Sequence, residues 1–468
     1  MSKKKRQTVT LVVLCLVLIA AGVGYYALTR YQASKEKAEK AEEEKTEGLF
    51  QLSSDDICKV DFKGEKASLT FDKDGKTWKL SSDKNYPLNQ DRIVDMVDET
   101  TGVAATQTVT TSCGDLTEYN LDKPDLTVTV TDNDGKDTTI YVGMESVAGG
   151  GRYAYCGGDE KKVYLISTSL YDSFNYSLGE LMKVPELPSV QADEIRYLKL
   201  ESATGKSFEA EYDEKNSPYK DIYGWSIKQP YTQPVAGDKD QLQNLFGSYT
   251  NLDLGSGVTY KKDAALEKKY GLDEPAYILS FQTAKKKLTL YFGKETKDQS
   301  SYYVKVKGED GIYLMDASTV STLVNINALD YVYQRLYVGD KEKLDQVELS
   351  CNGKKYTFDV SKKKKKSETE YTYTITSGGK KVDSDTFNTA YSVISYLAPG
   401  GNIDKNVTVK SNKPVAEFTF REEKKTTKMI ILPYDGKNSY RVSVNGVMQF
   451  TADKSAVDKV IKQFTSLK

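Results

Sequence analysis

The chain of 468 residues contains no histidine. This absence excludes serine–histidine–aspartate and cysteine–histidine nucleophile systems, and every zinc site that uses an imidazole ligand. It also removes the side chain that most often serves as a general base near pH 7. An enzyme with this composition would depend on carboxylates, lysines, tyrosines or serine–lysine pairs. We therefore predict a non-enzymatic protein with no catalytic residue, no cofactor and no metal ligand.

Cysteine is scarce, and neither sign of charge is in excess. The five cysteines, at positions 15, 58, 113, 156 and 351, include no C-x-x-C pair. Their wide spacing is typical of isolated thiols rather than of a disulfide framework, so we expect them to be free. The 66 basic and 67 acidic residues give a net charge of −1. Nucleic-acid binding needs a strongly basic face, so we predict no nucleic-acid partner.

One long hydrophobic run is present, close to the N-terminus. Basic residues 3–6 precede an uncharged run that is almost wholly apolar over residues 9–28. At about 1.5 Å per residue this run spans a bilayer, and the basic cluster should stay in the cytoplasm. We predict a basic tip and single transmembrane helix over residues 1–30, with residues 8–28 in the bilayer, and a helical stalk over residues 31–48. The bulk of the chain would then be extracytoplasmic. A cleaved signal peptide is the alternative, although the run is long for one.

A six-residue stretch occurs twice and indicates an internal repeat. Residues 119–124 read YNLDKP and residues 270–275 read YGLDEP. Asn120 and Gly271 suit a helix end that requires a positive φ, and the closing proline cannot extend a helix. Each copy follows a polar helical run and precedes an alternating strand pattern, so we interpret it as a helix-to-strand junction. The residues assigned to this junction are Tyr119, Leu121, Pro124, Tyr270, Gly271, Leu272 and Pro275.

The landmarks around the two junctions follow one order. Hairpin strands, a tryptophan strand, a proline break and a capped helix precede the junction, and a strand meander and a closing helix follow it. A third stretch repeats this order with only Lys413-Pro414 at the junction. We predict an α+β fold in which the transmembrane helix and stalk carry three repeated units of antiparallel β-meander with packed helices. The units cover residues 49–190, 191–338 and, in degenerate form, 339–468; among their helices we expect continuous ones over 169–182 and 317–329.

This order of motifs resembles an uncharacterised family, the domain of unknown function 4340. The residues that carry the resemblance are those of the two junctions, and it covers about residues 50–336. The third unit departs from it because the Tyr-Gly-Leu part is missing. The resemblance implies a single-span, extracytoplasmic bacterial protein, of a kind often associated with ABC transporters of the gliding-motility type. It implies no activity, cofactor or catalytic residue.

Two groups of residues are candidate contact surfaces. Tyr153 and Tyr155 lie on a hairpin that matches the hairpin of Tyr302 and Tyr303, and their rings could stack on a sugar or peptide. Packing within the sheet is the alternative for these tyrosines. The second group could meet an anionic wall polymer or lipid head groups, or simply form a solvated hairpin loop between two strands; its members are Lys362, Lys363, Lys364, Lys365 and Lys366.

Other patterns have simpler structural explanations. Ser81 and Lys84 have the spacing of a serine–lysine nucleophile, but we expect them in a loop and not at the start of a helix, and lysine is common in this chain. Residues 132–137 resemble part of a calcium loop without its closing glutamate, so we expect a turn. Taken together, the sequence favours an accessory or interaction subunit of an ABC-type transporter or envelope complex. The alternatives are a module that binds cell-wall glycan or anionic polymer, and a hydrolase with paired carboxylates in a deep pocket.

Overall fold

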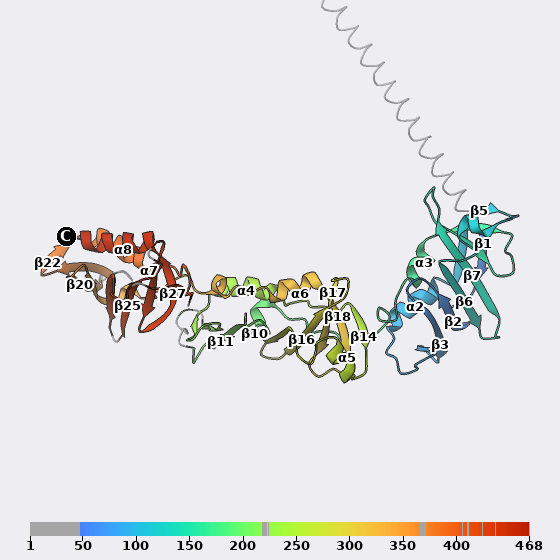
Figure 1. The fold of residues 1–468 in the computed structure, drawn as a ribbon, viewed down its shortest axis with the longest axis horizontal. Coiled ribbons are helices and arrows are strands. Elements are labelled where there is room, and N and C mark those ends of the chain that lie inside the picture. The colour runs from blue at the N-terminus through green and yellow to red at the C-terminus, as the bar shows by residue number, and fades with distance from the viewer. Residues whose placement is uncertain are drawn as a thin grey trace, which may run out of the picture. The chain divides into compact units, whose positions relative to one another are not determined.

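Three sheets of one kind make up the described part of the protein. The computed structural model describes residues 47–217, 222, 224–364, 371–404, 406–409, 411–423, 425–435 and 437–467. Within these ranges the strands form three nine-stranded sheets whose paired strands run antiparallel (Figure 1). Each sheet carries helices, so the predicted α+β fold with three repeated units is confirmed.

The first sheet has the strand order β1-β5-β9-β8-β7-β6-β2-β3-β4. The short helix η1 lies between β5 and β6, at the place of the first junction. The elements are β1 (Glu47–Gln51), β2 (Ile57–Lys63), β3 (Ser68–Asp74), β4 (Thr77–Leu80), α2 (Gln90–Asp98), β5 (Gly102–Thr110), η1 (Leu116–Tyr119), β6 (Leu126–Asp132), β7 (Asp137–Glu145), β8 (Arg152–Cys156), β9 (Val163–Ile166) and α3 (Ser169–Phe174).

The second sheet has the order β13-β12-β11-β10-β15-β16-β17-β18-β14. Helix α5 stands where η1 stands in the first repeat. The elements are η2 (Ala192–Glu194), β10 (Tyr197–Ser202), β11 (Phe208–Tyr212), β12 (Trp225–Gln229), β13 (Val235–Ala236), α4 (Lys239–Gly247), β14 (Ser256–Thr259), α5 (Ala264–Lys269), β15 (Tyr277–Gln282), β16 (Lys287–Glu295), β17 (Ser301–Val306), β18 (Ile312–Asp316), α6 (Ala317–Val324) and η4 (Ala328–Tyr331).

The third sheet has the order β22-β21-β20-β19-β24-β25-β26-β27-β23. In this repeat the described residues between β23 and β24 form no helix. The elements are η5 (Lys341–Lys343), β19 (Leu344–Cys351), β20 (Lys354–Lys364), β21 (Tyr371–Ser377), β22 (Lys380–Val382), α7 (Ser384–Ser395), β23 (Gly401–Asn402), β24 (Ala416–Glu422), β25 (Lys425–Pro433), β26 (Ser439–Val444), β27 (Val447–Asp453) and α8 (Lys454–Ser466).

The three sheets share one connectivity. The first strand of the N-terminal hairpin pairs with the first strand of the meander in every repeat: β2 with β6, β10 with β15, and β19 with β24. The strand that follows the first α-helix of each repeat then pairs with the last strand of the meander: β5 with β9, β14 with β18, and β23 with β27. A topology repeated in this way agrees with the duplication inferred from the sequence, and it includes the degenerate third copy.

The main hydrophobic core of the first and third repeats lies between one face of the sheet and the helices outside the junction. Figure 1 shows α7 and α8 side by side on one face of the third sheet, and both contribute to one core cluster with its strands. In the first repeat, α2 and α3 pack against the strands in one core cluster. The paired landmarks Trp78 and Trp225 are each only 4% exposed. The sequence offered Asn89 or Asp91 as the cap of the first helix and Asp238 or Asp240 as that of the second; Asn89 and Asp238 begin α2 and α4 by accepting backbone N–H bonds.

The opposite face of each sheet carries polar side chains paired across strands. On the first sheet Thr129 and Thr139 hydroxyls lie 2.9 Å apart. On the third, Lys428 forms an ion pair of 3.2 Å with Glu417. Cross-strand pairs of this kind stabilise a sheet face that remains in water.

Two helices are shorter than predicted, and several edge strands were missed. Instead of one helix over 169–182, α3 ends at Phe174, and Ser177 begins a separate turn with its backbone N–H bonded to the Glu180 carboxylate at 2.8 Å. The helix predicted over 317–329 is interrupted by Asn325, which is a poor helix former, and resumes as η4. The missed edge strands include β13, β22 and β23, which are two or three residues long and show no alternation to detect.

The chain divides into two compact units. Among the described residues, one comprises residues 47–185 with 255–260, and the other residues 186–254 with 261–467. The third sheet, and the second sheet apart from its edge strand β14, therefore belong to one unit. The predicted transmembrane helix lies outside the described residues, as does the predicted stalk up to residue 46. The last two residues assigned to that stalk, Glu47 and Gly48, belong to strand β1 and not to a helix. Within the part of the chain that the structure describes, no helix combines the length and apolar composition needed to cross a bilayer.

Candidate functional site

The predicted junction is a helix end with the same geometry in both repeats. Asn120 and Gly271 have φ angles of 56° and 72°, the left-handed conformation expected from the sequence. The N–H groups of Leu121 and Leu272 donate to carbonyl oxygens of the preceding helix at 2.9 and 2.8 Å. Both leucine side chains are buried, and the prolines lie two residues before the first residues of β6 and β15. The junction thus closes a helix and starts the meander.

A glycine on the meander lets the junction approach the sheet. A Cβ atom on Gly143 would lie 2.1 Å from the Tyr119 carbonyl oxygen, and one on Gly293 would lie 2.2 Å from that of Tyr270. Each glycine belongs to a β-bulge, where two residues oppose one on the next strand. In the second repeat the bulge frees the N–H of Lys294, which donates to the Tyr270 oxygen at 2.8 Å. In each repeat, the glycine therefore lets the junction pack directly against the sheet.

Replacing Gly271 by valine tests the left-handed helix end. A β-branched residue at this φ is strained, so we expect the second repeat to lose about 1 kcal/mol or more of stability. Gly271→Asn is the matched control, because Asn120 already occupies the same place in the first repeat. Local hydrogen exchange in α5 and β15 would report the difference. Equal protection in the two variants would contradict this account.

The junction tyrosines pack on the tyrosine-rich hairpins. Tyr119 and Tyr153 meet edge to face with centroids 4.9 Å apart, and the equivalent rings of Tyr270 and Tyr303 stack at 3.7 Å. Each hairpin tyrosine stands opposite the bulge. These ring contacts connect the two sequence motifs, junction and hairpin, that were recognised separately.

The remaining hairpin tyrosines also have partners within their own repeats. Tyr155 is 7% exposed and stacks on Tyr141 at 4.5 Å. Tyr302 donates its hydroxyl proton to Glu295 at 2.6 Å, and this bond, followed by burial, raises the pKa of Tyr302 to about 12. Much of the ring surface proposed for sugar stacking is therefore already used in packing.

The third repeat replaces the tyrosine pair with a polar contact. Arg441 stands in β26 opposite Leu432, in a stretch of regular register with no bulge. Its guanidinium donates to the Asn412 side chain at 2.8 Å and to the Pro433 carbonyl at 3.0 Å. The chain before Lys413-Pro414 is thus held by hydrogen bonds instead of a packed helix end.

An apolar groove lies between the second and third sheets, within the second compact unit. Its volume is about 420 Å³. Val235 and Val332 of the second repeat and Val442 and Phe450 of the third are all buried in its walls, whereas Val447 is 38% exposed. No sequence pattern indicated this groove, because its walls come from segments far apart in the chain.

Side-chain contacts join the two repeats at the groove. The Gln449 amide nitrogen donates to the Gln233 carbonyl at 2.9 Å, and its oxygen accepts from the Gln233 N–H at 3.0 Å. Nearby, the rings of Tyr231 and Phe450 meet at 5.2 Å. These contacts position the β27 wall against the loop before β13.

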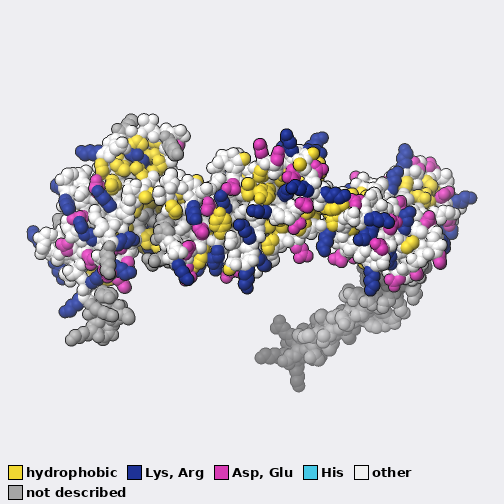
Figure 2. All heavy atoms as spheres, turned by 90° about the horizontal axis from the view of Figure 1, so that it is seen from below, with side chains coloured by type: hydrophobic (Ala, Val, Ile, Leu, Met, Phe, Trp, Pro, Cys, Tyr) yellow, Lys and Arg dark blue, Asp and Glu magenta, His cyan; other side chains and the backbone are white. Residues whose placement is uncertain are grey.

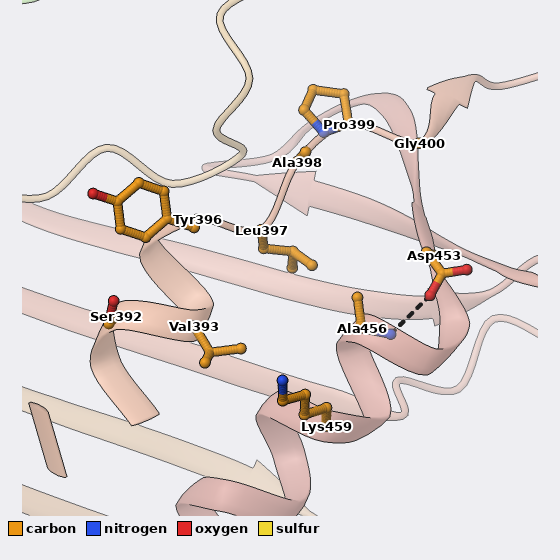
Figure 3. Close-up of a pocket in the computed structure, with 10 residues that line it drawn as sticks. All are labelled: Ser392, Val393, Tyr396, Leu397, Ala398, Pro399, Gly400, Asp453, Ala456 and Lys459. Atoms are coloured by element: carbon orange, nitrogen blue, oxygen red, sulfur yellow. Dashed lines mark hydrogen bonds between the residues drawn. The ribbon is translucent and has the colours of Figure 1, made fainter. Parts of the chain in front are cut away.

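A second hollow, of about 460 Å³, opens between α7 and α8 (Figure 3). Figure 3 shows Val393 on one helix facing Ala456 and Lys459 on the other, with the Asp453 side chain accepting from the Ala456 N–H at 2.8 Å. The nearby ring of Tyr396 is 63% exposed. The Arg335 guanidinium, which also lines the groove, lies 4.1 Å over that ring. Arg335 thus lines the groove and contacts one residue, Tyr396, that lines the second hollow.

Comparison with known proteins identifies the family of this chain. The family model described as "Domain of unknown function (DUF4340)" matches residues 78–221 and 225–419. The chain belongs to the DUF4340 family. The match extends into the third repeat, beyond the region that the junction motifs marked. Neither the curated proteins nor the solved structures give a match.

In this DUF4340 chain the lysine run extends a strand rather than forming only a loop. Lys362, Lys363 and Lys364 belong to β20 and pair with β21, whereas Lys365 and Lys366 lie outside the described residues. Lys362 donates to the Glu342 carbonyl at 2.6 Å and lies 3.7 Å from the Asp345 carboxylate. Lys363 is exposed. The run is therefore partly neutralised by neighbouring groups.

The DUF4340 chain shows charges of both signs on its surface. In Figure 2, basic and acidic side chains are interspersed over the face that is drawn. Among the described residues, no group of three or more acidic or cysteine side chains could hold a metal ion. Residues 132–137 form the expected turn, in which the Asp132 carboxylate accepts from the Lys136 N–H at 2.8 Å.

The four described cysteines of the DUF4340 chain are free thiols, and Cys156 offers a pH test. Burial, aided by Asp159, raises the pKa of Cys156 to about 11. Because the thiolate is the reactive form, we expect slow alkylation of folded protein at pH 8, with a rate that rises about tenfold per pH unit toward pH 11. In denaturant the same thiol should react readily, with an ordinary pKa of about 8.5. Peptide mass spectrometry after iodoacetamide treatment checks this; equal rates at pH 8 in folded and denatured protein would disprove it.

Proposed function

We propose that this DUF4340 protein is a membrane-anchored, extracytoplasmic, non-enzymatic interaction subunit that serves an ABC-type transporter or another envelope complex. The anchor would be the apolar run of residues 8–28 at the cell membrane, with the N-terminus in the cytoplasm. The observation that carries the proposal is that one chain builds the same sheet three times. On each sheet, the face opposite the main core carries polar side chains that pair across strands, and these are available to partners.

The anchor and the family resemblance supply the choice of partner. A basic cluster followed by an uncharged apolar run of this length is typical of a single span with the bulk of the chain outside. Repeated units are well suited to binding partners, because each copy offers an equivalent surface. A transporter permease in the same membrane would bring such a partner within reach.

Crosslinking in native membranes tests this proposal. The full chain, carrying an affinity tag, should recover a permease after treatment with a short amine-reactive crosslinker. The matched control is a fusion of residues 1–47 to an unrelated extracytoplasmic domain, which keeps the anchor but lacks the repeats. Recovery of the same permease by both proteins, or of the full chain alone, would count against the proposal.

The second proposal is binding of cell-wall glycan or an anionic polymer. Its specific support is the exposed Lys363, which lies beside the rest of the lysine run on β20. Lys363→Gln should reduce retention of the full chain by purified cell wall, and retention should fall with salt. Lys380→Gln is the matched control, because Lys380 is also exposed on the third sheet. An equal decrease in cell-wall retention for Lys363→Gln and Lys380→Gln would contradict this proposal.

A further inference from the structure

We propose that the groove between the second and third sheets binds an anionic amphiphile, a molecule with a hydrocarbon chain and a carboxylate or phosphate head group. This inference concerns a small-molecule site and does not depend on the transporter or envelope partner. It rests on three properties of the groove. The wall is apolar and of suitable size, one buried hydroxyl group has no hydrogen-bond partner among the described residues, and the described lining contains positively charged side chains but no carboxylate.

The groove walls suit a hydrocarbon chain. The volume of about 420 Å³ lies in the range of about 300–1,000 Å³ that is common for small-molecule sites. Leu336, Val338 and Val444 line the groove and are half-buried, so they present apolar surface inside it. Val447 is 38% exposed and gives the groove an open side. Moving an alkyl chain from water onto such a surface is favourable in proportion to the area covered.

A polar group in the groove lacks a partner within the described residues. Thr427 is 4% exposed, lines the groove, and has a buried hydroxyl oxygen without a hydrogen-bond partner. It lies on the same face of β25 as the core residue Met429. Burying an unpaired hydroxyl is unfavourable. An acceptor oxygen of a bound head group would satisfy it.

The charges of the groove select an anion. Arg335 and Lys425 both line it, and no Asp or Glu does so among the described residues. Within those residues neither cation forms an ion pair with a carboxylate. The planar guanidinium of Arg335 matches a carboxylate or phosphate, and an ammonium adds a second positive charge. The head group would lie at these cations, with the chain along the valines.

Photolabelling of the full chain, purified in an amphipathic polymer, tests the proposal. The probe is palmitate that carries a diazirine and an alkyne, compared with its methyl ester and with an alkyl phosphate of the same chain length. We expect the palmitate probe to label residues 442–450 and unlabelled palmitate to compete. The methyl ester should label weakly, and the alkyl phosphate distinguishes which head group is preferred.

Single substitutions locate the head group. Arg335→Gln and Lys425→Gln should each lower labelling roughly tenfold, the size expected for one charge-assisted hydrogen bond. Lys428→Gln is the matched control, since it lies on the same strand but on the opposite face, paired with Glu417. Unchanged circular dichroism melting shows that each variant is folded. A Val447→Trp variant, which fills the open side, should also label weakly.

Several outcomes would overturn the proposal. Equal labelling by the acid and its methyl ester would show that no anion is recognised. Labelling that maps only outside the groove, or that falls equally in all three charge variants, would show that the cations do not act there. Competition by a hydrophobic peptide with a free C-terminal carboxylate, together with none by palmitate, would assign the groove to a peptide.

Discussion

Replacement of Gly293 by alanine is expected to destabilise the second repeat by about 3 kcal/mol, the upper part of the usual range for overpacking. The added Cβ would lie 2.2 Å from the carbonyl oxygen of Tyr270, far inside contact distance. That oxygen cannot move away freely, because it accepts the N–H bond of Lys294 at 2.8 Å. The neighbouring Leu272 is buried and stacked rings hold Tyr270, so the whole junction would have to lift from the sheet.

Native-state hydrogen exchange of the full chain measures this effect, since a chain with several sheets does not unfold in one step. Amides of β15 and β16 should lose protection, whereas those of the first sheet should not. Gly247→Ala is the matched control: it lies at the end of α4 with nothing within 4 Å of its added Cβ. We expect that change to be neutral or slightly stabilising. Equal effects of the two alanines would show that the close approach is unimportant.

Replacement of Tyr337 by alanine is expected to cost the third repeat about 4 kcal/mol. Although Tyr337 precedes the third sheet, its ring is 1% exposed in that core and stacks on Phe420 at 3.8 Å. Its hydroxyl donates to the buried carboxyl group of Glu422 and lies 3.3 Å from the Tyr391 hydroxyl. The truncation would therefore leave a cavity and an unpaired buried acid together.

Companion variants separate packing from the hydrogen bond. Tyr337→Phe keeps the ring and should cost about 2 kcal/mol, because Glu422 loses its donor. Adding Glu422→Leu should recover part of that loss, since both polar partners are then removed. Tyr396→Phe, at a ring that is 63% exposed, should change stability by less than about 0.5 kcal/mol. Urea melting of the third-repeat transition would be compared; a loss in Tyr337→Phe no larger than in Tyr396→Phe would exclude the proposed role of the bond.

The same cluster makes the third repeat sensitive to alkali. Burial raises the pKa of Tyr337 well above its usual range and that of Tyr391 to about 12. In the unfolded chain both phenols would ionise near pH 10. The folded state holds these protons more tightly, so its stability is fully present below about pH 10 and falls as the pH rises above it. Tyr337→Phe should flatten this loss.

The local signals in the sequence correctly predicted the elements that depend on nearby residues. Asn120 and Gly271 were expected at positive φ because few other residues adopt it without strain, and both helix ends formed as predicted. The duplication was readable because landmarks such as Trp78 and Trp225 recur in order, and both are core residues. The end of one helix was predicted wrongly: the helix that begins at Ala317 ends at Val324, because Asn325 is a poor helix former.

The contacts between motifs could be established only by the folded chain. Alternation of side chains identified the hairpin of Tyr302 and Tyr303 as a strand pair, but alternation cannot show that Tyr303 stacks on Tyr270. It also cannot explain why Gly293 is a glycine, since the reason is a carbonyl oxygen from another segment.

By itself, the sequence determined the repeated α+β architecture, the two junctions and the absence of histidine chemistry, because periodicity, helix ends and composition depend on residues close together in the chain. Only the tertiary structure decided that a junction rests on a glycine bulge, that Tyr337 belongs to the third core, and that an apolar groove with Arg335 and Lys425 exists. These features arise where distant segments meet. The physical reason is that close packing and charge placement are set by three-dimensional neighbours, which one-dimensional patterns do not record.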